Sequence, residues 1–330
     1  MTKTCSQTGF SIVELMISVT ISLMLLSGLL SLFLHYKGSF NQNEAITRMQ
    51  EDARFAMDEL TRDVGMAGFV ADVLDPTSVV PDGSLSIVTD CGPPAAVDWI
   101  YEMRNPVTGA NSTLATADNV TAASVGASFS CINGGSVRPG TDVIALKRVV
   151  GRTAPAIEAG KVYVRTNGTV GLLYREPMAA PPAIPVPPPF RDWEFRPAIY
   201  FIQNFAVTPG DNIPTLCRMV LRPGVNPDMA PECIAQGIED LQAEFGIDTD
   251  GDGAAEFFAA NPTPAEMGQA VSVRVFLLAR SVNNDTRYDN DKTYNLSNAP
   301  AYTPNDNFHR RVFATTVLVR NLKNSRRLGI

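Results

Sequence analysis

The sequence predicts an α+β fold, in which one long N-terminal helix packs on an antiparallel β-sheet with large loop insertions. Three observations predict it. Residues 10–34 form an apolar run, and an amphipathic pattern with helical spacing follows it to residue 69. Later segments alternate apolar and polar residues with the period of two that strands have. With 330 residues and 45% apolar content, the chain is long enough for one large folded domain or two smaller ones after the helix.

The apolar run from Phe10 to Leu34 is long enough to cross a bilayer. A helix of this length spans roughly 37 Å, and the hydrocarbon layer is about 30 Å thick. Glu14 is the only charged residue in the run. An ionised side chain in that setting costs about 2.5–3.5 kcal/mol or more, so we expect Glu14 to pair with a cation or to serve a function. A plain membrane anchor is the alternative interpretation of the run.

The residues around the start of the run resemble a processing signal. Thr8-Gly9-Phe10-Ser11-Ile12-Val13-Glu14-Leu15 resembles the type III signal of type IV pilins and pseudopilins. The resemblance implies that a prepilin peptidase cleaves between Gly9 and Phe10, removes the leader 1–9 and methylates the new amine of Phe10. It also implies that Glu14 faces the N-terminal amine of a neighbouring subunit. A secretory signal peptide, by contrast, has an apolar core of about 7–15 residues and is cleaved after that core.

The helix is expected to continue beyond the membrane as an amphipathic half, residues 35–69. Its apolar residues recur at spacings of three and four and therefore share one face: Ile46, Met49, Ala53, Met57, Leu60 and Val64. Two oppositely charged pairs with a spacing of four support the other face: Glu44 with Arg48, and Asp58 with Arg62. Gly65 and Gly68 predict that the helix ends near residue 66.

The second half of the chain contains the clearest strand patterns. Residues 271–280 alternate strictly, and residues 312–320 are rich in β-branched types. Shorter candidate strands are 84–89, 142–150, 161–166, 171–175, 198–204 and 216–222. Because the long candidates can form one antiparallel sheet against the apolar face of the helix, the pattern favours the α+β class.

A proline-rich segment, residues 177–189, divides these candidates. Proline has no backbone N–H group, so such a segment cannot join the interior of a sheet and forms extended, polyproline-like chain. We interpret it as a loop that separates an inserted β-rich lobe, residues 70–176, from a β-sheet region, residues 190–330. A docking motif for a partner is the alternative.

The cysteines indicate an oxidising compartment. Cys5 lies in the leader, and four cysteines remain after it: Cys91, Cys131, Cys217 and Cys233. An even number in an exported chain is typical of two disulfides. Of the three possible pairings we favour Cys91 with Cys131 and Cys217 with Cys233, because closure between sequence neighbours keeps each bridge within one insertion. A redox or metal site would require closer spacing of the CxxC kind, which the sequence lacks.

A possible calcium loop begins at Asp248. Asp248, Asp250, Asp252 and Gly253 match positions one, three, five and six of an EF-hand-type loop, and Glu256 occupies the ninth position. The twelfth position, which should be glutamate, is Ala259. Because a turn rich in Asp and Gly also forms without a metal, a calcium site and a solvated turn both remain open.

The sequence offers little for catalysis or for nucleic-acid binding. It has two histidines, His35 at the membrane edge and His309, and it lacks nucleophile-elbow, phosphate-loop, zinc and dinucleotide-binding motifs. We therefore expect no enzyme. Neighbouring acids such as Glu239 and Asp240 are interpreted as a solvated face. The net charge of −7 argues against nucleic acid as the primary partner, since such a surface needs a basic field.

Two further segments narrow the resemblance. Residues 52–69 resemble the helix end of PilW-type minor pilins, and residues 238–253 resemble a later motif of that family. The chain departs from major pilins in its larger size and in lacking a proline within residues 10–34. The resemblance implies a minor pilin that primes or caps type IV pilus assembly and enters the filament at low copy. It implies a single-pass inner-membrane protein with its C-terminal domain in the periplasm, later found in the pilus at the cell surface.

The same resemblance implies the partners. They are a prepilin peptidase, other minor pilins, the major pilin and the inner-membrane assembly platform, in support of twitching motility, adhesion or DNA uptake. Two alternatives stay open. One is a minor pseudopilin of a type II secretion system, which shares the leader and the anchor. The other is a single-span adhesin that never polymerises and keeps an uncut N-terminus.

Overall fold

The computed structural model describes residues 9, 11–73, 78–89, 91–92, 99–101, 103, 114–121, 123–177, 186–297 and 299–321. The chain divides into two compact units, Met1–Arg48 and Met49–Ile330. A long N-terminal helix and predominantly antiparallel sheets confirm the predicted α+β class.

The helix α1 runs from Ile12 to Gly65 without interruption. Its end agrees with the predicted stop near residue 66, since a turn that contains Gly68 at φ +75° follows. Both predicted ion pairs form on its surface, with N–O distances of 2.6 Å for the pair at residues 44 and 48 and 2.8 Å for the pair at residues 58 and 62.

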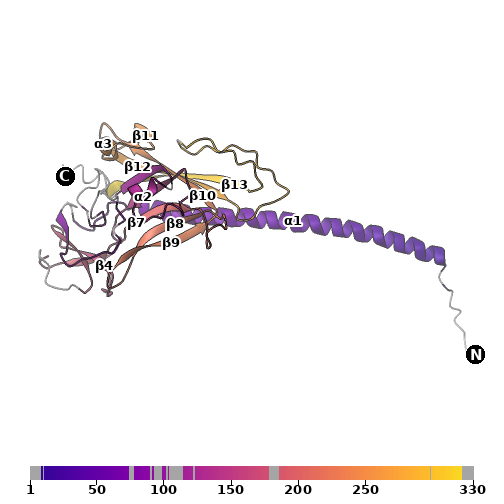
Figure 1. The fold of residues 1–330 in the computed structure, drawn as a ribbon, viewed down its shortest axis with the longest axis horizontal. Coiled ribbons are helices and arrows are strands. Elements are labelled where there is room, and N and C mark those ends of the chain that lie inside the picture. The colour runs from indigo at the N-terminus through magenta and orange to yellow at the C-terminus, as the bar shows by residue number, and fades with distance from the viewer. Residues whose placement is uncertain are drawn as a thin grey trace, which may run out of the picture. The chain divides into compact units, whose positions relative to one another are not determined.

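The second unit contains three sheets, and Figure 1 labels most of their strands. The first has the strand order β1 (Val79–Pro81), β5 (Gly171–Arg175), β4 (Val162–Thr166) and β6 (Arg191–Glu194). The second has the order β11 (Phe257–Ala259), β10 (Ile238–Ile247), β12 (Ala270–Arg280) and β13 (Arg310–Leu318). The third has the order β2 (Leu114–Val120), β3 (Thr141–Leu146), β7 (Ala198–Gln203), β8 (Thr215–Arg222) and β9 (Asp228–Gln236). Two short helices complete the unit: α2 (Val125–Ser128) and α3 (Pro264–Met267).

Strand pairing crosses the proline-rich segment twice. The strand β4 pairs with β6, and β3 pairs with β7, so the ranges 70–176 and 190–330 share two sheets. One buried cluster also joins them, since it contains Val164 of β4 and Ile199 of β7. In the described residues the two ranges therefore share two sheets and one buried apolar cluster. Residues 178–185, the middle of the proline-rich segment, lie outside them.

The strand predictions were partly wrong. Residues 84–89 form no strand, because Leu85 closes a turn onto Asp82 and the Ile87 amide donates to the Tyr101 hydroxyl. The strands β9 and β10 were not predicted. They are joined by Gly237 at φ +74°, where a Cβ atom would lie 2.4 Å from the carbonyl oxygen of Arg280. Only glycine fits this close approach, and it lets the chain pass from the third sheet into the second.

The end of α1 packs with its apolar residues inward. Ala53, Ala56, Leu60 and Val64 are fully buried, whereas Met57 of the predicted stripe is only half-buried. Burying a leucine side chain stabilises a fold by about 1.5–3 kcal/mol. The predicted apolar face is thus essentially correct, but it also contains a carboxylate that the pattern does not mark, that of Asp63.

Candidate functional site

The predicted processing site lies at the border of the described chain. Gly9 is exposed, and no atom outside its own neighbourhood lies within 4 Å of the position a Cβ would take there. Residues 1–8 and Phe10 lie outside the described residues. Cleavage after Gly9, methylation of Phe10 and the fate of Cys5 therefore stay predictions.

Glu14 lies in the first turn of α1. The helix begins after Ser11, whose hydroxyl oxygen accepts a hydrogen bond from the Val13 amide at 3.3 Å. Ser11 and Glu14 have the spacing of a capping box, in which the glutamate would bond back to the cap amide. In the described part of the chain, however, the Glu14 carboxylate makes no hydrogen bond and no ion pair. Helix capping therefore does not explain why a carboxylate stands at position 14.

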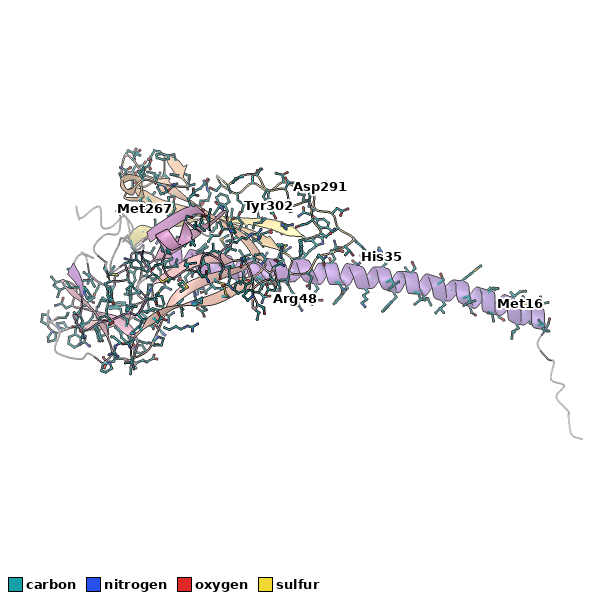
Figure 2. All side chains as sticks on the ribbon, in the orientation of Figure 1. Met16, His35, Arg48, Met267, Asp291 and Tyr302 are labelled. Carbon is teal, nitrogen blue, oxygen red and sulfur yellow. A yellow bond between two sulfur atoms is a disulfide. The ribbon has the colours of Figure 1, made fainter. Side chains whose placement is uncertain are left out.

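The apolar surface around Glu14 is uncovered. The large apolar side chains between Ile12 and Leu34 are 49–79% exposed, and Figure 2 draws them along α1, Met16 among them. The most apolar 18-residue window of this helix has a mean hydropathy of 2.2, and none of it is buried. By length and composition the helix can cross a membrane. Such an apolar surface is unfavourable in water, which fits a helix that is covered by lipid or by other helices.

The last turns of α1 carry the opposite kind of carboxylate. Asp63 is 4% exposed. Its Oδ1 accepts from Nε and Nη2 of Arg148 at 3.0 and 2.5 Å, and its Oδ2 accepts from the Tyr200 hydroxyl at 2.6 Å. Burial and the adjacent Asp63 charge raise the pKa of Tyr200 well above its usual range, so its hydroxyl stays a donor.

A second contact fixes the same part of the helix. Nη1 of Arg218, on β8, donates to Glu59 at 3.2 Å and to the Tyr200 hydroxyl at 3.3 Å. Arg148 follows β3, Tyr200 lies on β7 and Arg218 lies on β8. Side chains from three neighbouring strands of the third sheet, or from just after one of them, therefore contact the helical turn from Glu59 to Asp63. Asp63, Arg148 and Arg218 also line an open cavity of about 300 Å³. The charges bordering it are paired with one another, which fits a structural role.

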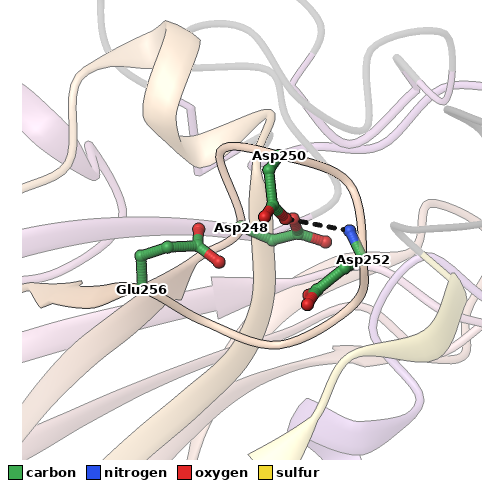
Figure 3. Close-up of side chains that lie close together, drawn as sticks. All are labelled: Asp248, Asp250, Asp252 and Glu256. Carbon is green, nitrogen blue, oxygen red and sulfur yellow. Dashed lines mark hydrogen bonds between the residues drawn. The ribbon is translucent and has the colours of Figure 1, made fainter.

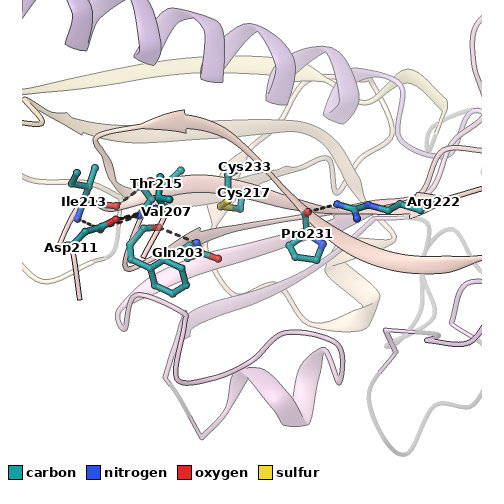
Figure 4. The surroundings of a disulfide bond; sticks show 11 residues. Gln203, Val207, Asp211, Ile213, Thr215, Cys217, Arg222, Pro231 and Cys233 are labelled. Atoms are coloured by element: carbon teal, nitrogen blue, oxygen red, sulfur yellow. Dashed lines mark hydrogen bonds between the residues drawn. A yellow bond between two sulfur atoms is a disulfide. The ribbon is translucent and has the colours of Figure 1, made fainter. Parts of the chain in front are cut away.

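Both disulfides join the cysteines that the sequence analysis paired. Cys91 bonds Cys131 across 40 residues, and Cys217 bonds Cys233 across 16. In the second bridge the two cysteines lie opposite each other on β8 and β9, beside a hydrogen bond from Arg222 to the Pro231 carbonyl (Figure 4). The bridge therefore fastens an outer strand to its neighbour.

The four predicted calcium ligands come together in one loop (Figure 3). Asp248, Asp250, Asp252 and Glu256 each offer an oxygen within 4.8 Å of the others, and Asp248 alone is buried. The loop also closes by itself, because each carboxylate accepts a backbone N–H group: Gly251 and Gly253 to Asp248, Asp252 to Asp250, Ala254 to Asp252, and Thr249 to Glu256. It connects two strands, β10 and β11, and Ala259 pairs with Phe245 in the sheet. The geometry suits a hard cation but also a turn without one, and calcium stays a prediction.

Glu239 corrects the interpretation of a solvated acidic face. It is 2% exposed, and its carboxylate accepts from Nε of Arg310 at 2.5 Å and from Nη2 of Arg138 at 2.9 Å. Arg310 also donates to Asp306 at 2.6 Å. The cluster ties the connection between β12 and β13 to β10. No sequence signal marks it, because the partners of Glu239 lie 71 and 101 residues away.

Comparison with known proteins gives two partial matches. Residues 199–321 match the family described as type IV pilus-assembly protein W (PilW), and residues 5–30 match the prokaryotic N-terminal methylation motif. No curated protein and no solved structure gives a significant match. The two matches lie at opposite ends of the chain. They cover the segment that contains Glu14 and the whole second sheet. Together they support a type IV pilin-like minor pilin of the PilW type.

Proposed function

We propose that this type IV pilin-like chain is a minor pilin that primes or caps assembly of a type IV pilus and enters the filament at low copy. The observation that carries the proposal is the first turn of α1. There a matched methylation motif contains one carboxylate, Glu14, without a partner in the described chain, on a helix whose apolar surface is uncovered. In a bundle of similar helices, Glu14 would gain a partner and the apolar surface would be covered.

The proposed mechanism is electrostatic registration. Cleavage after Gly9 would leave a positively charged amine on Phe10. In a bundle of like helices Glu14 leaves water and lipid headgroups behind, and a buried carboxylate without a cation costs several kcal/mol. The amine of an adjacent subunit supplies that cation, so only one axial offset between neighbouring helices satisfies both charges.

The proposed route to the filament follows from the same segment. The unprocessed chain is held in the inner membrane by α1, with the second unit in the periplasm, where the disulfides form. A prepilin peptidase acts on the leader, and the assembly platform passes the chain to the other minor pilins and the major pilin. The role proposed is structural, without catalysis.

The test is the substitution Glu14→Ala in cells that assemble pili. We expect the variant to insert in the membrane and to keep the thermal stability of the second unit, while surface piliation falls about tenfold or more. Glu44→Ala is the matched control, because Glu44 is an exposed carboxylate on the same helix. Wild-type piliation with the Glu14 variant would contradict the proposal.

The two alternatives predict different results. A pseudopilin of type II secretion would lose secretion, not piliation, on deletion of the chain, and the match to a pilus-assembly family favours the pilus. A non-polymerising adhesin would keep its N-terminus. Mass spectrometry of the first peptide separates it from a pilin, which begins with methylated Phe10.

A further inference from the structure

The strand β13 offers a free backbone edge. It is the outer strand of the second sheet and pairs with β12 from Arg310 to Leu318 without any shift in register. In the part of the chain that the structure describes, no segment other than β12 forms a backbone hydrogen bond with β13. Such an edge presents a row of unpaired N–H and C=O groups on which a further strand can form.

The other outer strands are protected in the ways that usually prevent such pairing. The strands β1, β6 and β11 have only three or four residues. The strand β2 has an irregular register, and β9 carries Pro231 in its middle and is cross-linked by a disulfide. Short length, irregular register and proline all discourage an added strand. Among the described strands, β13 is the long outer one without any of these features.

Its side chains leave room for a partner. Ala314, Thr316 and Leu318 are exposed, and Leu318 is 54% exposed. On the same face Val312 is covered by an apolar cluster that includes Tyr294 and Leu296, so the uncovered part begins after it. Two small residues beside an exposed leucine give an added strand space for bulky apolar or β-branched side chains.

The charge at the start of β13 indicates which partner fits. Arg310 is neutralised internally by Glu239 and Asp306. Arg311 is exposed and has no ion pair among the described residues. A second copy paired antiparallel about Ala314 would place Val317 opposite Arg311 and would leave this charge unmatched. A segment with an acidic residue at that position matches it.

We propose that the outer edge of β13 binds an extended, β-branched segment of another pilin-like subunit, with an acidic residue opposite Arg311. The edge itself follows from the sheet, whereas the identity of the partner rests on the proposed function. Main-chain hydrogen bonds supply the affinity, and the acidic residue at Arg311 supplies the register.

The experiment places a photo-reactive phenylalanine analogue at position 316 of the full-length chain in cells that assemble pili. Position 225 is the matched control, because Val225 is 80% exposed in the turn between β8 and β9. We expect an adduct with another pilin-like subunit from position 316 and none from position 225. The cross-linked peptide should be β-branched and contain an acidic residue.

Charge variants then test the mode of binding. Arg311→Glu should lower the adduct yield at least fivefold and Arg311→Lys should retain it, while thermal unfolding shows that each variant is folded. Ala314→Lys, at an exposed position, gives the same loss should Arg311→Glu fail to fold. The inference is overturned by an adduct with a second copy only, by no adduct, or by a yield that none of these variants changes. Its failure is separable from that of the proposed function, because Glu14→Ala changes piliation without altering β13.

Discussion

Two carboxylates on the same helix show how differently the two units use charge. Glu14, in the first turn of α1, has no partner in the described chain and stands in an uncovered apolar surface. Asp63, in the last turns, is 4% exposed and is held by Arg148 and Tyr200. Within the described residues, Glu14 therefore lacks a partner, whereas Asp63 has its partners in place.

This contrast separates assembly from folding. Because the second unit pairs the buried charges of Asp63 and Glu239 internally, we expect it to fold without a neighbouring subunit. Under the proposed function, the first unit gains a partner for Glu14 and cover for its apolar surface when other helices replace lipid around it. Substitutions at the two sites should therefore affect different measurements.

The largest effect is expected at Asp63. Asp63→Ala removes the charge that neutralises Arg148 and the acceptor of the Tyr200 hydroxyl, and breaking a buried pair on one side costs about 3–5 kcal/mol. Chemical unfolding of the second unit should show this loss, while Glu14→Ala should leave its stability unchanged. Asp58→Ala is the matched control, because Asp58 forms only an exposed pair and should change stability by less than about 1 kcal/mol. Equal losses for Asp63 and Asp58 would break the contrast.

The sequence predicted local features well and distant ones poorly. The helix end and its two ion pairs depend on neighbours within four residues, and both agree with the structure. Asp63 was not singled out, because Arg148 lies 85 residues away. The strand β10 was missed for a related reason. Its acids suggested solvent, but Glu239 is neutralised by arginines that only the folded sheet brings near.

The next largest effect is expected at the disulfides. Removing either one should lower the stability of the second unit. In the loop-entropy account, removing the bridge across 40 residues costs about 4 kcal/mol, and removing the bridge across 16 costs about 3 kcal/mol. We expect the double serine variant of Cys91 and Cys131 to unfold at lower denaturant concentration than that of Cys217 and Cys233. The reverse order would show that fastening the outer strand β9 matters more than loop length.

A smaller effect is expected on the pH dependence of stability, through the partly buried carboxyl group of Asp240. Burial raises the pKa of Asp240 to about 6, although Gln242 donates a hydrogen bond to it. In the unfolded chain the value is about 4. The protonated carboxyl is thus favoured by folding, and its contribution is fully present below pH 4 and lost as the pH rises through 6.

Asp240→Asn isolates that contribution. Between pH 4 and pH 7 the wild-type protein should lose about 2 kcal/mol more stability than the variant, because asparagine cannot ionise. Other carboxyl groups titrate in the same range, so the difference between the two proteins is the quantity to measure by urea unfolding. Parallel pH profiles would show that Asp240 ionises in the folded state as it does in the unfolded state.

The smallest effect is expected at the loop of Asp248, Asp250, Asp252 and Glu256. The charge compensation of these carboxylates is intermediate between that of Glu14 and that of Asp63. Their oxygens accept backbone N–H groups, but no positively charged side chain neutralises them in the described hydrogen bonds and ion pairs. Four carboxylates within 4.8 Å repel one another, and a divalent cation would relieve that repulsion.

Without the glutamate of the twelfth position we expect weak calcium binding, with a dissociation constant of about 1 mM. Calcium at about 5 mM should then stabilise the second unit by about 1 kcal/mol, a rise of roughly 2 °C in the melting temperature that a chelator reverses. The double variant Asp250→Asn and Asp252→Asn should abolish the rise, and Asp291→Asn, at an exposed acid elsewhere, should keep it. A wild-type melting temperature that calcium does not change would leave the loop as a solvated turn, whose hydrogen bonds to the backbone suffice to close it.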